Sequence, residues 1–236
     1  MQEAWQPGQY HPGKQGLYDF ANEHDACGVG FVANIKGNRT HKIIEDGIEV
    51  LRRLLHRGAA GSDPDTGDGA GILFQIPDEF FKSGDAGIDF ELPEAGHYGV
   101  AMVFLPREEA LREKCEQIII ESVSAEKLEL LGCRAVDVDE SKLGRVARSS
   151  CPVIKQYFVG GRGEMDEAAF ERRLYTLRRV IGKRVNVETD SGDAFYVCSL
   201  SCRTIVYKGL LMAPQVPEFF KDLTHPKAVS ALAIVH

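Results

Sequence analysis

The sequence predicts an α+β protein in which an antiparallel or mixed sheet is covered by helices. Strand-like and helix-like segments follow one another in an irregular order, without the regular βαβ repeat of a parallel sheet. Residues 194–201 and 204–207 form two apolar, alternating runs joined by a short turn, which favours antiparallel strands. Residues 41–56 carry apolar side chains at helical spacing. These three observations together indicate the fold class.

The first elements lie at residues 28–56. Residues 28–35 are short, apolar and bounded by turn formers, so we expect a buried strand there, followed by a turn at 36–38. Residues 41–56 are expected to form a helix that ends at His56-Arg57-Gly58, with a cationic last turn and a glycine stop. Its apolar face consists of Ile44, Ile48, Leu51 and Leu55.

The rest of the chain is predicted to mix strands with two longer helices. One helix starts after Pro106 and continues to about Leu131, and another is N-capped by Asp166 and runs to about Lys183. Further strands are expected at 72–76, 98–105, 133–138, 152–159, 194–201, 204–207 and 229–236. Because the last apolar run stops at His236, inside an expected strand, we expect the domain to be incomplete at its C-terminus.

Composition narrows the class of protein. The chain has 236 residues, 44% of them hydrophobic, and a net charge of -7, which fits one large globular domain and argues against nucleic acid as a partner. No apolar run is long enough for a membrane span or a secretion signal, so we expect neither. The six cysteines lack the spacing of a zinc or redox motif, and this use of cysteine fits a reducing cytoplasm. Cys198 and Cys202 are expected to face the same side of a sheet, and no metal site is expected.

Cys27 is the strongest candidate for chemistry. It lies between a polar leader, residues 1–26, and the first expected strand. If the leader is a propeptide, cleavage before Cys27 places a thiol and a free α-amine on one residue. An α-amine has a pKa of about 7.7 to 8.0, so it can take the thiol proton without a histidine. The alternatives are that the leader is an ordinary tail and that Cys27 is a small buried residue.

A glycine-rich loop follows the first expected helix. Gly67-Asp68-Gly69-Ala70-Gly71 precedes a strand rather than a helix and lacks a lysine, so it matches neither a dinucleotide fingerprint nor a P-loop. We expect a tight loop that lets the backbone approach a small ligand or a neighbouring strand. The sequence also lacks a Gly-x-Ser-x-Gly elbow and a His-x-x-x-His pair, so a serine hydrolase or a catalytic zinc is unsupported.

Several segments, in order along the chain, resemble the N-terminal class II glutamine amidotransferase domain of glutamate synthase large chains. The main ones are Cys27-Gly28-Val29-Gly30-Phe31, Leu51-Arg52-Arg53-Leu54-Leu55-His56-Arg57-Gly58, Thr66-Gly67-Asp68-Gly69-Ala70-Gly71-Ile72-Leu73, Phe170-Glu171-Arg172-Arg173-Leu174-Tyr175 and Ser199-Leu200-Ser201-Cys202-Arg203-Thr204-Ile205-Val206-Tyr207-Lys208-Gly209. The combination is specific, whereas any one segment alone is not.

The resemblance implies a four-layer αββα N-terminal-nucleophile hydrolase fold with two facing antiparallel sheets over residues 27–236. It implies that residues 1–26 are removed and that Cys27 attacks the side-chain amide of glutamine to give a thioester, ammonia and then glutamate. Arg57, Gly67, Asp68 and Gly69 would contact glutamine or support the residues that do. The Arg57 charge could favour the thiolate, although a simple role at the end of the helix is equally compatible with its position.

The same resemblance implies a longer enzyme. Ammonia would pass to 2-oxoglutarate in later domains that carry FMN and an iron–sulphur cluster, cofactors not expected within these 236 residues. A small reductase subunit could be a partner, and the location would be cytoplasmic, or the plastid stroma for a plant-type source.

The chain also departs from the family pattern. The family continues after the final His with a Ser-Arg-Phe-Ser-like run that grips the glutamine α-carboxylate, and later with an Asn-Gly oxyanion pair. Because both are absent, we expect the 236 residues alone to be a poor glutaminase. The alternatives are an inactive binding or regulatory module with the same fold and a related amidotransferase with another acceptor. The length of the segment between the glycine loop and the 194–207 strands favours glutamate synthase.

Overall fold

A computed structural model describes residue 16 and residues 28–55, 63–163 and 165–236. Its strands form two four-stranded antiparallel sheets, which confirms the predicted α+β class. Sheet 1 has the order β1 (Gly30–Ala33), β8 (Leu232–Val235), β2 (Ala70–Gln75), β7 (Thr204–Gly209). Sheet 2 has the order β4 (Glu129–Ala135), β5 (Val153–Gly160), β3 (Tyr98–Leu105), β6 (Tyr196–Ser201).

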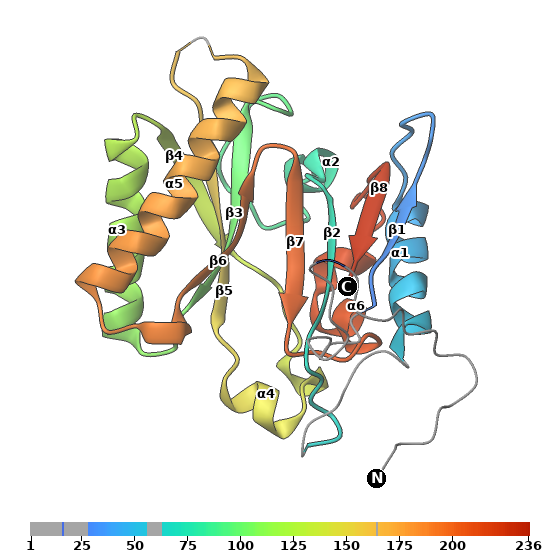
Figure 1. Cartoon of the computed structure of the whole chain (residues 1–236). Helices are drawn as coiled ribbons and strands as arrows, with labels where there is room; N and C mark the ends of the chain where they lie inside the picture. Colours follow the sequence, from blue (N-terminus) through green and yellow to red (C-terminus); the bar gives the residue numbers. More distant parts are fainter. Residues whose placement is uncertain (1–15, 17–27, 56–62, 164) are drawn as a thin grey trace.

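Helices cover the two outer sides of this pair of sheets. Helices α3 (Glu109–Ala125) and α5 (Glu167–Glu188) lie beside sheet 2, and α1 (His41–Arg53) packs against β8 and β1 on the opposite side of the molecule (Figure 1). This order of helices, sheet, sheet and helix agrees with the four predicted layers. The short helices and 3-10 turns that sequence analysis did not predict are α2 (Asp78–Lys82), η3 (Glu140–Lys142), α4 (Arg145–Ser149), η4 (Gly192–Ala194), α6 (Gln215–Phe219) and η5 (Lys221–Thr224).

Alternation along β3 divides the core into two clusters. Ala101, Val103 and Leu105 pack with the buried side chains of α3 and α5. Val100 and Met102 point the other way, into the larger cluster that includes α1 and sheet 1. Because successive side chains of a strand point to opposite faces, one apolar strand serves both clusters.

Helices α1 and α5 form for local reasons. In α1, Ile44, Ile48 and Leu51 recur on one face and are buried, as predicted. In α5, the Asp166 side chain accepts a hydrogen bond of 2.6 Å from the Ala169 N–H, which confirms the predicted N-cap. The α5 helix continues five residues beyond Lys183, because Val185 extends its buried face.

The predicted helix from Pro106 to Leu131 is wrong at its end. Helix α3 stops at Ala125, and Lys127 adopts a left-handed φ of 58°, which no helix accommodates. Strand β4 then starts at Glu129, four residues before the predicted strand 133–138. Periodicity alone does not reveal this reversal, because Leu128 and Leu131, three residues apart, are compatible with one more helical turn.

The buried strand predicted at 28–35 is also wrong in part. Strand β1 covers only residues 30–33, and its Phe31 side chain is 76% exposed. The strand lies at the edge of sheet 1 and pairs with β8, and Ala33, on the same side of the strand as Phe31, is exposed too. The helix predicted at 41–56 ends at Arg53, and its expected last apolar position, Leu55, is half exposed.

Two predictions about β6 fail. Met102 of β3 lies opposite Ser199, but the next residue, Val103, lies opposite Val197, so Cys198 is an extra residue in β6. Cys198 therefore packs into the core cluster of sheet 1, whereas Cys202 packs with α3 and α5, on opposite sides. In addition, β6 and β7 belong to different sheets, although a short turn joins them as predicted.

Across the described part of the chain, none of the helices has the length and apolar character needed to cross a bilayer.

Candidate active site at one end of sheet 1

Three strand ends meet where the chain enters β1. Gly30 at the start of β1 lies opposite Val235 of β8, and Val235 in turn lies opposite Ile72 of β2. Gly71 and His236 exchange two backbone hydrogen bonds, of 2.9 and 3.2 Å. The segment before β1 and the glycine loop before β2 therefore open at the same end of sheet 1.

The structure describes three of the five predicted site residues. Cys27 and Arg57 lie outside the described residues, so their positions are not assigned. Gly67, Asp68 and Gly69 are described and lie at this end of sheet 1, directly before β2. The Asp68 side chain is exposed.

Close backbone approach explains Gly67, and backbone conformation explains Gly69. A Cβ atom at Gly67 would lie 2.4 Å from the carbonyl oxygen of Leu211, a distance that no side chain tolerates. Gly69 has a φ of +140°, a conformation that residues with a Cβ rarely adopt. The loop was predicted to approach a small ligand or a neighbouring strand, and at Gly67 it approaches Leu211, which follows strand β7.

Asp63 and Thr66 hold the loop against helix α4. The Thr66 hydroxyl donates a 2.7 Å hydrogen bond to Asp63 Oδ2, which also accepts one of 3.0 Å from the Val146 N–H. The Ala147 N–H donates to Thr66 Oγ1 at 3.3 Å. The Val146 N–H, followed by the Thr66 hydroxyl, lowers the pKa of Asp63 below its ordinary value, so the carboxylate is ionised at neutral pH.

Gln215 of α6 holds the same loop from a second direction. Its side-chain amide donates to the carbonyl oxygens of Asp65, at 2.9 Å, and Lys142, at 3.0 Å. Its Oε1 accepts a 2.7 Å hydrogen bond from the Met212 N–H. The residues that hold the loop were not among the predicted site residues, although Asp63-Pro64-Asp65-Thr66 is typical of an Asx turn. No local signal marks Gln215, because its partner Asp65 is 150 residues away.

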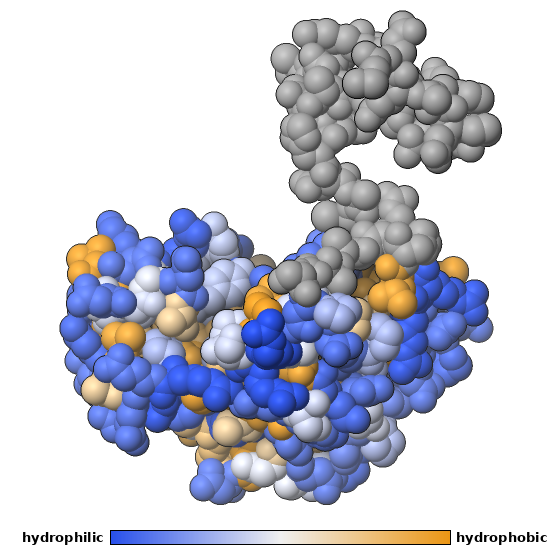
Figure 2. Space-filling view, turned by 90° about the horizontal axis from the view of Figure 1, so that it is seen from below, coloured by the Kyte–Doolittle hydropathy of each residue, from blue (hydrophilic) through white to orange (hydrophobic). Residues whose placement is uncertain are grey.

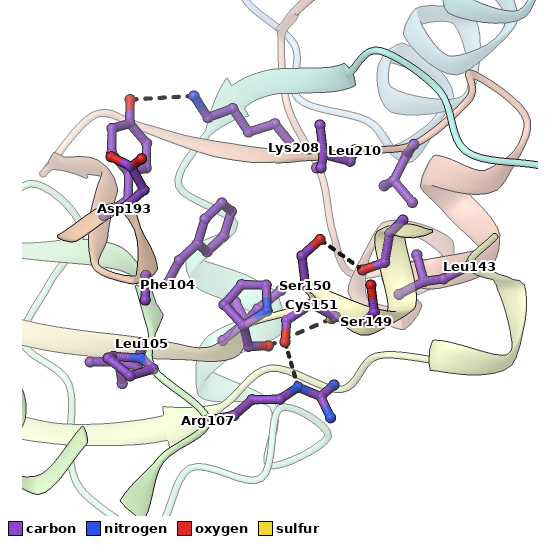
Figure 3. A pocket seen from close by; sticks show the side chains of 18 of the residues that line it. Phe104, Leu105, Arg107, Leu143, Ser149, Ser150, Cys151, Asp193, Lys208 and Leu210 are labelled. Carbon is purple, nitrogen blue, oxygen red and sulfur yellow. Dashed lines mark hydrogen bonds between the residues drawn. The ribbon is translucent and has the colours of Figure 1, made fainter. Parts of the chain in front are cut away.

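A cavity of about 440 Å³ includes Leu211 in its wall, and Figure 3 shows the side chains that line it. The ends of β3 and β6, helix α4 and residues 209–211 form its mostly apolar walls, and Leu211 belongs both to the wall and to the contact with Gly67. The Lys208 side chain lines the cavity, and its Nζ lies 3.3 Å from the Tyr196 hydroxyl and 4.5 Å from the centre of the Tyr196 ring. Cys151 is part of the wall, and burial raises the pKa of its thiol, so it is a poor nucleophile at neutral pH.

The surface around this end of sheet 1 carries both apolar and polar side chains. Figure 2, which views the molecule from below, shows apolar patches between polar residues. The exposed apolar side chains include Val29, before β1, and Leu210, after β7. Within residues 28–55, 63–163 and 165–236, no three His, Cys, Asp or Glu side chains form a group that could hold a metal ion.

Comparison with known proteins identifies the family. The family model described as glutamine amidotransferases class-II matches residues 27–236, so the match starts at the cysteine selected from the sequence. The chain belongs to the class II glutamine amidotransferases. The N-terminal-nucleophile hydrolase fold is therefore shown for this chain, together with its two antiparallel sheets.

The relatives are glutamate synthases, which confirms the resemblance found in the sequence. The chain is 47% identical over 226 residues to the glutamate synthase [NADPH] large chain of Bacillus subtilis, covering 95% of this chain and 14% of the relative. It is 42% identical over 235 residues to the glutamate synthase [NADH] of Saccharomyces cerevisiae, covering 95% and 11%. It is 40% identical over 214 residues to ferredoxin-dependent glutamate synthase 2 of Synechocystis, covering 91% and 13%. The chain thus spans less than one sixth of the length of each of these relatives.

Proposed function

We propose that this class II amidotransferase is the glutaminase part of a glutamate synthase and that Cys27 is its nucleophile. The observation that carries this proposal is the family match that begins at Cys27 and continues to residue 236. It is supported by the topology, because the chain enters β1 three residues after Cys27, at the end of sheet 1 where the glycine loop lies.

The proposed reaction uses the two functional groups of an N-terminal cysteine. The α-amine takes the thiol proton, and the thiolate attacks the carboxamide carbon of glutamine. The C–N bond breaks, the amine returns the proton to the leaving nitrogen, and ammonia departs from a thioester. Water then attacks the thioester, which releases glutamate and restores the thiol. The Arg57 cation would favour the thiolate, and Gly67, Asp68 and Gly69 would line or support the site.

The rest of the reaction belongs to parts of the protein beyond this chain. Ammonia would combine with 2-oxoglutarate in domains that carry FMN and an iron–sulphur cluster. The described residues do not fit such a cluster, because no group of three or more Cys or His side chains comes together in them. The relatives are named for NADPH, NADH and ferredoxin, so we assign no electron donor, and a small reductase subunit remains one candidate partner. We place the enzyme in the cytoplasm, or in the plastid stroma in a plant-type source, as the name of the spinach relative, which includes "chloroplastic", suggests by analogy.

The test uses the complete protein with Cys27 replaced by Ala or Ser. Glutamine-dependent glutamate formation should be lost, whereas formation from added ammonia should persist. The mass of the purified wild-type protein should show that the mature chain begins at Cys27, and a diazoketone analogue of glutamine should add to that residue. An intact leader without labelling would instead favour an inactive binding module. Glutamine turnover by Cys27→Ala would overturn the proposal.

A further inference from the structure

We infer that Asp63, Thr66 and Gln215 are positioning residues for glutamine hydrolysis, because they fix the glycine loop at the end of sheet 1 where the chain enters β1. This inference rests on the proposed function. None of the three need touch glutamine. Their role is to hold Gly67, Asp68 and Gly69 in place through contacts with two distant segments of the chain.

The contact between the loop and α4 replaces an ordinary helix cap. Helix α4 is preceded by Gly144, which has no side chain to cap it. Two N–H groups of its first turn bond instead to Asp63 and Thr66, which are 83 and 81 residues earlier in the chain than Val146 and Ala147. A Cβ at Gly144 would lie 2.4 Å from Thr66 Oγ1, so the glycine is what permits this approach. The contact between the loop and α4 therefore depends on residues of both segments.

Gln215 completes the attachment from the other side. Its amide joins the backbone of Asp65 to that of Lys142, which lies in η3 just before α4. Its oxygen accepts from Met212, the neighbour of the residue whose carbonyl packs against Gly67. Three segments thus converge on a loop that has few side chains of its own to hold it.

The placement of this loop explains why such an attachment serves the reaction. Strands β1 and β2 are separated by β8 alone, so at about 4.8 Å per strand the loop before β2 lies about 10 Å from the segment that enters β1. A displacement of about 1 Å at a reacting group can cost on the order of 100-fold in rate. A loop of glycines cannot hold such precision by itself, since glycine restricts the backbone least.

The experiment compares variants of the complete protein in which single hydrogen bonds of this attachment are removed. Thr66→Val and Gln215→Ala remove them, Asp63→Asn weakens them by removing the carboxylate charge and replacing one acceptor oxygen with an NH2 group, and Thr66→Ser keeps the hydroxyl as a conservative rescue. Asp139→Asn is the matched control, since Asp139 caps η3 by accepting from the Ser141 N–H at 3.0 Å and does not contact the loop. We measure kcat and KM for glutamine, activity with added ammonia, and hydrogen exchange at the amides of residues 65–71.

We expect Asp63→Asn and Thr66→Val to lower kcat for glutamine about tenfold or more, with faster exchange in the loop and unchanged activity with ammonia. Thr66→Ser and Asp139→Asn should stay within about twofold of the wild type. If exchange rises while glutamine turnover is unchanged, or if Asp139→Asn loses as much activity as Asp63→Asn, the inference is overturned. Should Asp63→Asn fail to fold, the Thr66→Val and Thr66→Ser pair decides. Glutamine turnover by Cys27→Ala would refute the nucleophile without changing what these loop variants report.

Discussion

Arg134 of β4 and Asp222 of η5 form an ion pair in which both side chains are only 5% exposed, although they are 88 residues apart. Gln156 of β5 accepts a 2.8 Å hydrogen bond from Arg134, and its amide donates to the Tyr207 hydroxyl at 3.0 Å. Tyr207 of β7 in turn donates to Asp222 at 2.7 Å. The ring of contacts joins β4 and β5 of sheet 2 to β7 of sheet 1, so this polar network fixes how the sheets sit together.

Replacing Asp222 with Asn should destabilise the folded domain strongly. The change leaves the Arg134 guanidinium buried without its counter-charge, and removing one partner of a buried pair costs about 3–5 kcal/mol. Urea unfolding followed by circular dichroism measures the loss. The control is Asp46→Asn, which breaks an exposed pair with Lys42 on α1 and should leave the midpoint almost unchanged. Equal midpoints for the two variants would show that the buried ion pair stabilises the fold no more than the exposed pair does.

Two glycines inside helices should respond to alanine with opposite signs. At Gly47 of α1 a Cβ would lie 2.9 Å from the Cβ of Ala233 in β8, so Gly47→Ala should cost about 1–3 kcal/mol by overpacking. At Gly182 of α5 a Cβ meets nothing within 4 Å, so Gly182→Ala should gain up to about 1 kcal/mol from helix propensity. Thermal unfolding of both variants measures the difference. A stabilising Gly47→Ala would mean that α1 can move away from the sheet at little cost.

The parts of the fold that depend on neighbours in sequence could be predicted, and the parts that depend on distant segments could not. The spacing of Ile44, Ile48 and Leu51 and the cap at Asp166 are local signals, and both were confirmed. The extra residue at Cys198 exists only in register with β3, and nothing in its own segment signals it.

The candidate site also contains one part that its local sequence predicts and another part that depends on distant segments. The glycine loop was found from its composition, since glycine is the residue that allows close approach and positive φ. The atoms that hold the loop belong to α4 and α6, which are five-residue helices too short for a periodic pattern. Their contacts cross 81 to 150 residues, so only the folded chain brings them together.

Acid should weaken the attachment at Asp63. The hydrogen bond from Val146, together with that from Thr66 and the nearby Arg145 charge, lowers the pKa of Asp63 in the folded state below its ordinary value of 3.8. A lowered carboxyl pKa contributes stability that is complete above the ordinary value and is lost as pH falls through the folded value. The stability difference between the wild type and Asp63→Asn should therefore be constant above about pH 5 and shrink below pH 4. Urea midpoints from pH 2.5 to 7 test this, and a difference that grows in acid would contradict it.

Alkylation should distinguish Cys133 from the buried cysteines. Among the described residues Cys133 is exposed, whereas Cys115, Cys151, Cys198 and Cys202 are buried. Burial raises the pKa of Cys198 to about 11 and that of Cys202 to about 12. Since the thiolate is the reactive form, nearly all Cys198 thiols are protonated and unreactive at pH 7.5.

Iodoacetamide should therefore modify Cys133 in minutes and leave the four buried thiols intact, as peptide mass mapping would show. In guanidinium chloride Cys133 and the four buried cysteines should react at similar rates, which controls for access. Cys133→Ser should abolish the fast addition at that position, and any fast addition that remains should map to Cys27 if it is the nucleophile. Rapid modification of Cys198 in the folded protein would contradict the burial, because its thiol lies between the sheets and contacts the Val206 carbonyl at 3.6 Å.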